Sequence, residues 1–223
     1  MIGAFCGDVV GSIYEFNNCK STEFPLFTSE SRFTDDSVMT VATMDALVNN
    51  KGYTETYIKW FKKYPNAGYG GSFFRWCISS SHKPYNSWGN GSAMRVSPVG
   101  FWYDSLEEVL EGAKKSAEVT HNHPEGIKGA KSTAAAVFLA RKGSSKRYIK
   151  EYIEKQFKYD LSESVDSIRR WYHFDVSCQG SVPQAIICFL QSDNFEDAIR
   201  KAVSIGGDSD TIACITGGIA EAY

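Results

Sequence analysis

Apolar residues recur at helical spacing along most of this chain. Val38, Met39, Ala42 and Ala46 fall on one face after Asp36, as expected for a helix with one buried side. The same pattern and the caps before it predict helices at Asp36–Asn49, Ile127–Arg141, Ser145–Phe157, Val165–Trp171, Val182–Leu190, Phe195–Val203 and Asp210–Tyr223, and two more that begin at Thr54 and at Asp104 or Ser105. No segment alternates between apolar and polar residues in the manner of a strand. The sequence therefore predicts an all-α fold, a multi-helix bundle.

Three glycines punctuate the N-terminal segment at intervals of four residues. Gly3, Gly7 and Gly11 would form a single stripe of small residues if this segment is helical. Such a stripe lets a second helix approach closely.

Two stretches lack a clear helical pattern. Asn17–Arg32 is polar and aromatic, and Asn66–Gly100 is rich in Gly, Ser, Asn and aromatic residues. A long irregular stretch in a compact domain is either functional or partly helical. We expect a short helix at Phe73–Ile78 within the second one.

Composition narrows the class of protein. A chain of 223 residues with 43% hydrophobic content fits one globular domain spanning residues 1–223, and the formal net charge of -2 argues against a general binder of nucleic acids or anionic membranes. None of the six cysteines forms a C-x-x-C pair, so we expect buried thiols in a reducing compartment. The N-terminus has no basic segment before Asp8, and no stretch approaches about 18 uncharged apolar residues. We expect a cytoplasmic protein that acts as a monomer.

Two short acidic clusters lie near opposite ends of the chain. The first acid cluster is Thr34-Asp35-Asp36, and the second acid cluster is Asp208-Ser209-Asp210-Thr211, which follows Gly206-Gly207. Each precedes an apolar helical pattern, so each could simply cap a helix. Together they could form an all-oxygen cage for Mg²⁺, Mn²⁺ or Ca²⁺, because carboxylates gathered in one place need cations between them. The spacing alone leaves both interpretations open.

Other motifs offer weaker signals. Glu15 lies at the end of the N-terminal segment, and a lone glutamate at such a position is more often exposed to solvent than catalytic. Gly89-Asn90-Gly91-Ser92 and Tyr69-Gly70-Gly71-Ser72 could present backbone N–H groups to a phosphate, although each could equally be a turn. His121 belongs to H-N-H-P-E, which lacks a third zinc ligand, so we expect it to contact a ligand from a polar loop.

Read in order, these segments resemble a known family. G-D-V-V-G-S-I-Y-E, F-T-D-D-S, G-N-G-S-A-M-R, T-H-N-H-P and G-G-D-S-D-T-I-A follow one another as in the ADP-ribosylglycohydrolases. The resemblance spans Ile2 to Tyr223, and G-S-I-Y-E is closer to the branch that removes ADP-ribose from serine than to the arginine branch. Family members usually continue beyond the position of Tyr223.

The resemblance implies an orthogonal all-α bundle with two Mg²⁺ ions in a cleft, Mn²⁺ being the alternative. The implied metal ligands are Thr34, Asp35, Asp36, Asp208, Asp210 and Thr211. The implied binding loops for ADP-ribose are Tyr69, Gly70, Gly71 and Ser72 together with Gly89, Asn90, Gly91 and Ser92, with His121 near the distal ribose or the adenine. Glu15 resembles the mobile catalytic glutamate of the serine branch.

The resulting hypothesis is hydrolysis of the glycosidic bond between ADP-ribose and an acceptor. Glu15 or Asp36 would serve as general acid or base, and Asp35 would be required for turnover. Two alternatives remain at this point: a module that binds ADP-ribose without turnover, and a metal-dependent phosphohydrolase of a related nucleotide.

Overall fold

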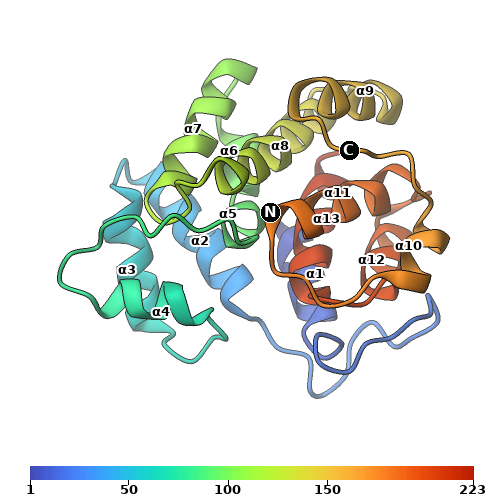
Figure 1. Cartoon of the computed structure of the whole chain (residues 1–223), viewed down its shortest axis with the longest axis horizontal. Helices are drawn as coiled ribbons and strands as arrows, with labels where there is room; N and C mark the ends of the chain where they lie inside the picture. The colour runs from blue at the N-terminus through green and yellow to red at the C-terminus, as the bar shows by residue number, and fades with distance from the viewer.

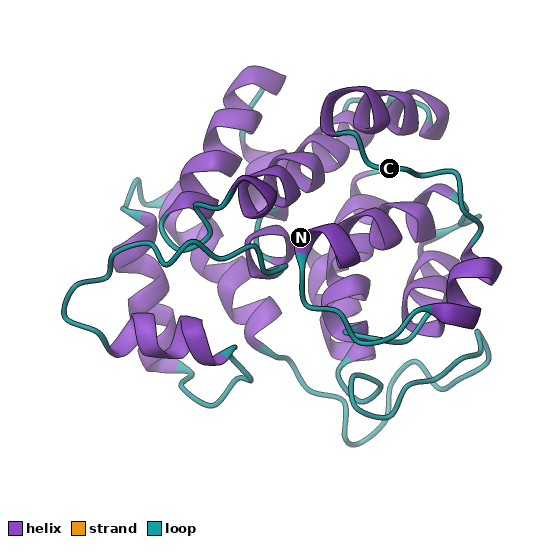
Figure 2. Ribbon diagram, viewed as in Figure 1, coloured by secondary structure: helices purple, strands orange, loops and turns teal.

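The computed structural model describes all 223 residues, and its regular elements are all helices, joined by loops and turns, apart from one isolated antiparallel bridge between Gly89 and Ser177 (Figures 1 and 2). The thirteen helices are α1 (Ile2–Gly11), α2 (Asp35–Val48), α3 (Tyr53–Lys63), α4 (Gly71–Ile78), α5 (Gly91–Met94), α6 (Ser97–Trp102), α7 (Leu106–Glu118), α8 (Pro124–Arg141), α9 (Lys146–Phe157), α10 (Val165–Trp171), α11 (Cys178–Leu190), α12 (Phe195–Ser204) and α13 (Ser209–Ala222). The predicted all-α class is confirmed.

Most predicted helix starts carry the expected side-chain caps. Ser105 caps α7 and forms a reciprocal capping box with Glu108, and Ser145 accepts a bond from the Tyr148 amide at the start of α9. Thr54 is not a cap, because α3 begins one residue earlier, after Gly52. The start of α11 was also misplaced: the helix begins at Cys178 behind Ser177, and the sequence pattern concealed this because Pro183 lies inside the helix.

The long stretch 66–100 is partly helical. It contains α4, which confirms the short helix expected there, and it also contains α5 and the start of α6. Pro98 lies in the first turn of α6, where its missing N–H leaves no helical bond unmade. Stretch 17–32 has no helix, and Arg200 donates two bonds from Nη1 to the carbonyl oxygens of Thr22 (3.0 Å) and Phe24 (2.9 Å) within it.

Helix α13 lies at the centre of the C-terminal half, surrounded by α1, α11 and α12 (Figure 1). Every residue from Ser209 to Ile219 is buried, so this helix has no solvent face before its last turn. Helix α8 joins the two halves of the fold, because it packs on α7 and α6 as well as on α11 and α13. Its alanine run, Ala134–Ala136, is fully buried and admits these neighbours closely.

Helices α1 and α13 pack backbone against backbone. A Cβ atom at Gly7 would collide with the carbonyl oxygen of Ala213, and one at Gly11 would collide with the Cα atom of Asp210. A Cβ atom at Gly217 would likewise collide with the carbonyl oxygen of Gly3. The predicted small-residue stripe therefore lies at a helix contact, and it fixes the register between the two ends of the chain.

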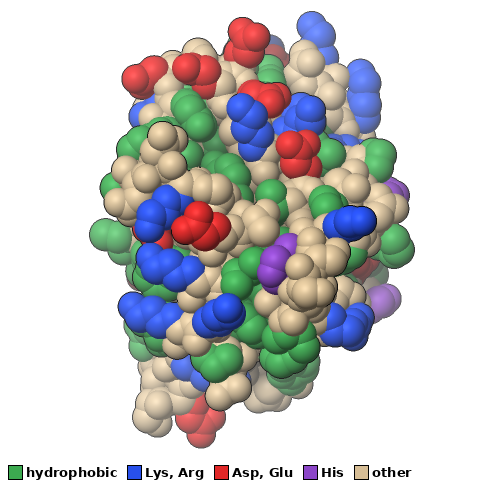
Figure 3. Space-filling model, turned by 90° about the vertical axis from the view of Figure 1, so that its left-hand side faces the viewer, with side chains coloured by type: hydrophobic (Ala, Val, Ile, Leu, Met, Phe, Trp, Pro, Cys, Tyr) green, Lys and Arg blue, Asp and Glu red, His purple; other side chains and the backbone are tan.

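The remaining expectations concern cysteines, charge and membranes. All six cysteines are free. Cys77, Cys178, Cys188 and Cys214 are buried as expected, whereas Cys6 and Cys19 are only partly buried. Figure 3 shows basic, acidic and apolar side chains interspersed on one face of the molecule. None of the thirteen helices combines the length and the apolar character needed to cross a lipid bilayer.

The contact between α1 and α13 leads to a stability prediction. Gly7→Ala should lower the free energy of unfolding by about 3 kcal/mol or more, because the added methyl group meets backbone that has no room to move. Gly52→Ala is the matched control, since a Cβ there meets nothing within 4 Å, and its effect should stay within about 1 kcal/mol, the cost of alanine at the N-cap of α3. Urea unfolding of both variants measures the difference. Equal midpoints would show that the close approach has no energetic consequence.

Candidate functional site

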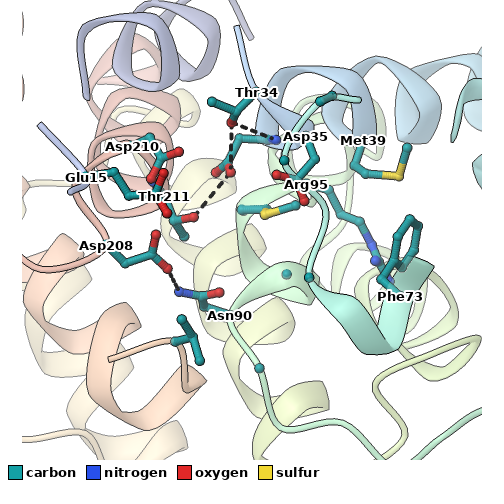
Figure 4. A pocket seen from close by; sticks show the side chains of 18 of the residues that line it. Glu15, Thr34, Asp35, Met39, Phe73, Asn90, Arg95, Asp208, Asp210 and Thr211 are labelled. Carbon is teal, nitrogen blue, oxygen red and sulfur yellow. Dashed lines mark hydrogen bonds between the residues drawn. The ribbon is translucent and has the colours of Figure 1, made fainter. Parts of the chain in front are cut away.

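A cleft of about 570 Å³ opens between the two halves of the helix bundle (Figure 4). It is lined by the starts of α2, α4 and α13, by the segment around α5, and by the segments next to α1 and α11. Both acid clusters contribute to one end of this cleft. Their positions at the starts of α2 and α13 explain how residues far apart in sequence reach a single space.

At the start of α2, Thr34 fulfils the predicted cap. Its hydroxyl oxygen accepts a bond from the Asp36 amide at 3.3 Å. The same hydroxyl donates to Asp8 Oδ1 at 2.7 Å, and the Thr34 amide donates to Asp8 Oδ2 at 2.9 Å. Ser37 adds two further bonds to Asp8 Oδ2, from its amide (3.1 Å) and its hydroxyl. Asp8 thus ties the start of α2 to α1.

Asp8 is the acid that sequence reasoning missed. It is fully buried in α1, and its carboxylate lies within 4.8 Å of those of Asp36 and Asp210. The signal available in the sequence was an aspartate in an otherwise apolar helical stretch, one residue after Gly7 of the glycine stripe. A buried acid needs partners, and Thr34 and Ser37 supply them.

The start of α13 has an unusual backbone. Gly206 and Gly207 both have φ of +74°, a region that other residues avoid. Asp208 follows at the N-cap position but makes no capping bond, and instead its Oδ2 accepts from Asn90 Nδ2 at 2.6 Å. The glycine pair therefore turns the chain so that the carboxylate of Asp208 points into the cleft (Figure 4).

The two acid clusters meet in space. Thr211 of the second cluster donates from its hydroxyl to Asp36 Oδ2 of the first, at 3.2 Å (Figure 4). The carboxylates of Glu15, Asp208 and Asp210 also lie within 4.8 Å of one another. Asp36 Oδ1 is buried and has no hydrogen-bond partner. An orphaned carboxylate oxygen beside further acids and two threonine hydroxyls is a donor set that fits hard divalent cations.

Burial and mutual repulsion govern the protonation of these acids. Burial and then the charge of Asp210 raise the pKa values of Asp35 and Asp36 well above the ordinary value. Burial and then Asp208 do the same to the pKa of Asp210. Burial raises the pKa of Asp208 to about 6, against the opposing bond from Asn90. Such a group holds protons at neutral pH unless cations replace them.

Glu15 is held beside the second acid cluster by Asn18. The Asn18 side chain donates to the carbonyl oxygen of Glu15 (2.8 Å) and to that of Gly207 (3.2 Å), and it accepts from the Gly207 amide (2.8 Å). Glu15 lines the cleft and is half-buried. Burial, followed by the charge of Asp210, raises the pKa of Glu15 to about 7, although Arg32 opposes the shift.

The predicted ligand loops reach the cleft in part. Gly70, Gly71, Ser72, Gly89, Asn90, Gly91 and His121 all line it. Tyr69 and Ser92 are not among the residues that line it. The ring of Tyr69 stacks on Phe73 at 5.5 Å between ring centroids, and the fully buried Ser92 donates from its hydroxyl to the Gly126 carbonyl at 2.7 Å. Both side chains therefore pack against the protein beside the loops they belong to.

Further groups line the cleft that the sequence did not single out. Phe16 and Phe174 form an exposed pair at the rim, with ring centroids 6.1 Å apart. Arg95, from the end of the G-N-G-S-A-M-R motif, is 1% exposed and lines the end of the cleft near His121. The two ends of the cleft thus differ in charge.

Comparison with known proteins agrees with this arrangement. The family model described as ADP-ribosylglycohydrolase matches residues 1–223, and the chain belongs to this family of hydrolases that act on ADP-ribose linkages. The chain is 26% identical to the ADP-ribosylhydrolase ARH3 of Mus musculus and 28% identical to that of Homo sapiens, each over 303 aligned positions that cover 100% of the chain and 82% and 84% of the relatives. It is also 26% identical to the putative ADP-ribosyl glycohydrolase L543 of Acanthamoeba polyphaga mimivirus.

A solved structure supports the fold. The chain superimposes on one titled "ADP-ribosylglycohydrolase-related protein complex" with a TM-score of 0.74 and 21% sequence identity, over 100% of this chain and 84% of that one. The orthogonal bundle that the sequence resemblance implied is thereby confirmed.

The raised pKa values lead to a prediction for the metal-free protein. In EDTA, the melting temperature should fall by about 5 °C as pH rises from about 6.5 to about 7.8, because the native state holds protons that the unfolded carboxyl groups, with pKa values of about 4, have released. Added Mg²⁺ should stabilise the protein more at the higher pH, where the acids are ionised. The interval begins at the pKa of unfolded histidine, about 6.5, so His121, whose pKa is lowered in the native state, offsets the fall by at most about half a proton. The interval ends below the pKa of unfolded cysteine, about 8.5. A melting temperature in EDTA that rises over this range would contradict the prediction.

Proposed function

We propose that this protein hydrolyses the glycosidic bond that joins ADP-ribose to a modified acceptor and releases free ADP-ribose. The observation that carries the proposal is the meeting of two acid clusters at one end of a cleft whose other end is formed by glycine-rich loops and His121. The acids would bind cations that contact the ribose of the substrate, and the backbone N–H groups of the loops would bind its diphosphate. Family membership supports the reaction class.

Six residues would hold two Mg²⁺ ions, or Mn²⁺ in their place: Thr34, Asp35, Asp36, Asp208, Asp210 and Thr211. When bound, the ions would supply Lewis-acid contacts to the ribose hydroxyls and lower the pKa of a coordinated water. Asp8 would act from behind this set, because all four hydrogen bonds of its carboxylate are accepted from Thr34 and Ser37. It would hold the start of α2 in place.

Glu15 would perform the proton transfer, with Asp36 as the alternative. The oxygen of water attacks C1 of the ribose, the bond from C1 to the acceptor breaks, and the acceptor leaves with a proton. A carboxyl group whose pKa is about 7 can donate that proton and can also accept one from the attacking water. Neighbouring carboxylates stabilise the positive charge that develops on the sugar.

Serine is the proposed acceptor. The G-S-I-Y-E segment resembles the serine branch, and Glu15 lies beside the acid cluster, held there by Asn18. A panel of substrates with ADP-ribose on serine, on arginine and on nucleobases, incubated with and without EDTA, tests this choice. Free ADP-ribose as the product supports glycosidic cleavage. AMP would indicate a phosphohydrolase, and binding without any product would indicate a binding module.

Asp210→Asn should lower turnover by about three orders of magnitude, because several kcal/mol of transition-state stabilisation depend on this carboxylate and its cations. Asp166→Asn is the matched control, since Asp166 is exposed on α10 and pairs only with Arg169. Release of ADP-ribose and bound magnesium are measured for both variants. Full activity with normal metal content in Asp210→Asn would refute the assignment.

Glu15→Gln should separate chemistry from binding. We expect kcat to fall by about 10²- to 10⁴-fold, the usual contribution of a general acid or base. Magnesium content and the Kd for ADP-ribose should change little, because no residue of the proposed metal set is removed. Single-turnover kinetics and calorimetry measure the two effects. An equal loss in kcat and in ADP-ribose affinity would assign Glu15 to binding instead.

A further inference from the structure

Arg95 is a buried charge without an acidic partner. Its side chain is 1% exposed, and none of the ion pairs in the structure includes it. The guanidinium lies over the ring of Tyr57, 4.4 Å from the centroid, and Nε is buried without a hydrogen-bond partner. A permanent charge placed this way costs stability. Its retention beside the cleft calls for a physical reason.

The contacts of Arg95 determine where a neighbouring proton lies. Arg95 Nη2 donates to the carbonyl oxygen of Ser116 and to the hydroxyl oxygen of Thr120, both at 2.9 Å. Thr120 is fully buried, and its hydroxyl lies 2.7 Å from Nδ1 of His121. Because a guanidinium only donates, the hydroxyl proton of Thr120 has one acceptor within reach, which is His121 Nδ1.

This arrangement fixes the tautomer of His121. With Nδ1 accepting, the proton of the neutral ring must be on Nε2. Burial and then the charge of Arg95 lower the pKa of His121 well below its ordinary value, so the ring is neutral. Nε2 faces the loop at Gly89–Gly91, since a Cβ atom at Gly91 would lie 3.3 Å from it and one at Gly89 would lie 3.5 Å from it. It makes no hydrogen bond within the protein and lines the cleft as a free donor.

We infer that Arg95 and Thr120 are positioning residues that hold His121 as an Nε2–H donor to the diphosphate of ADP-ribose. The inference rests on the proposed function. A donor aimed at the glycine-rich loop and an uncompensated cation behind it both favour an anionic oxygen at this place. The opposite tautomer would present a lone pair to that oxygen and repel it. Thr120 thereby connects a buried cation to the imidazole ring that would donate to the ligand.

The magnesium-loaded protein and two substitutions at Thr120 test the inference. Thr120→Val keeps the shape of the side chain and removes the hydroxyl, whereas Thr120→Ser retains the hydroxyl. Long-range ¹H–¹⁵N spectra report the protonation of each ring nitrogen, and the chain has only four histidines, so His121→Gln assigns the signals. We expect a protonated Nε2 and a bare Nδ1 in the wild type and in Thr120→Ser, and a mixture of tautomers in Thr120→Val.

Binding of ADP-ribose should follow the tautomer. Calorimetry should give a Kd about tenfold weaker for Thr120→Val and within about threefold of the wild type for Thr120→Ser. Arg95→Met should weaken binding at least as much as Thr120→Val, and the double variant should lose less than the sum of the two, because both residues act through His121. If Arg95→Met does not fold, the Thr120 series decides alone.

Several results would overturn the inference. These are a wild-type His121 protonated at Nδ1, a Thr120→Val spectrum identical to the wild type, and a Thr120→Val variant with unchanged affinity for ADP-ribose. A protein that shows the expected tautomers and affinities but cleaves no substrate would overturn the proposed hydrolysis and leave this inference standing. A wild type that does not bind ADP-ribose would overturn both.

Discussion

The candidate site depends on the backbone contact between α1 and α13. Helices with ordinary side chains between them lie about 8 to 10 Å apart, which would carry Asp8 and Glu15 away from the second acid cluster. Glycines at the contact remove that spacing, and Gly11 lies directly against the backbone of Asp210. The first and last helices of the chain thus deliver their acids to one point. A packing requirement in the core and a chemical requirement in the cleft are met by the same small residues.

Both helix starts at the acid end combine capping with a second role. At α2, Thr34 caps the helix through its hydroxyl oxygen, which leaves the carboxylates of Asp35 and Asp36 free for other contacts. At α13, Asp208 stands at the cap position but gives its carboxylate to Asn90, so the helix end contributes its positive dipole without using the acid. The dipoles offset part of the repulsion among the acids. The raised pKa values show that they do not offset all of it, and cations would complete the balance.

Most of the helices and both acid clusters could be predicted from the sequence, because helical spacing, caps and acidic clusters depend on neighbouring residues. The glycine stripe likewise predicted a close contact with another helix, but it did not identify that helix. Asp8 escaped prediction because its partners Thr34 and Ser37 lie 26 and 29 residues further along the chain. Tyr69 was assigned to the ligand because a tyrosine beside two glycines fits a binding loop as well as a packed one. Only the fold shows its ring against Phe73.

The two ends of the cleft carry opposite charge, and Asn90 lies between them. At one end carboxylates exceed the available positive groups, and at the other Arg95 forms no ion pair with any acid. No charged group of the protein neutralises either end. The acid end therefore attracts cations, and the end at Arg95 attracts anions. Asn90 bonds to Asp208 through its side chain and belongs to the same glycine-rich loop that His121 faces. Cations held by the acids together with a diphosphate near His121 would relieve both imbalances at once, whereas a cation or a phosphate alone would relieve only one.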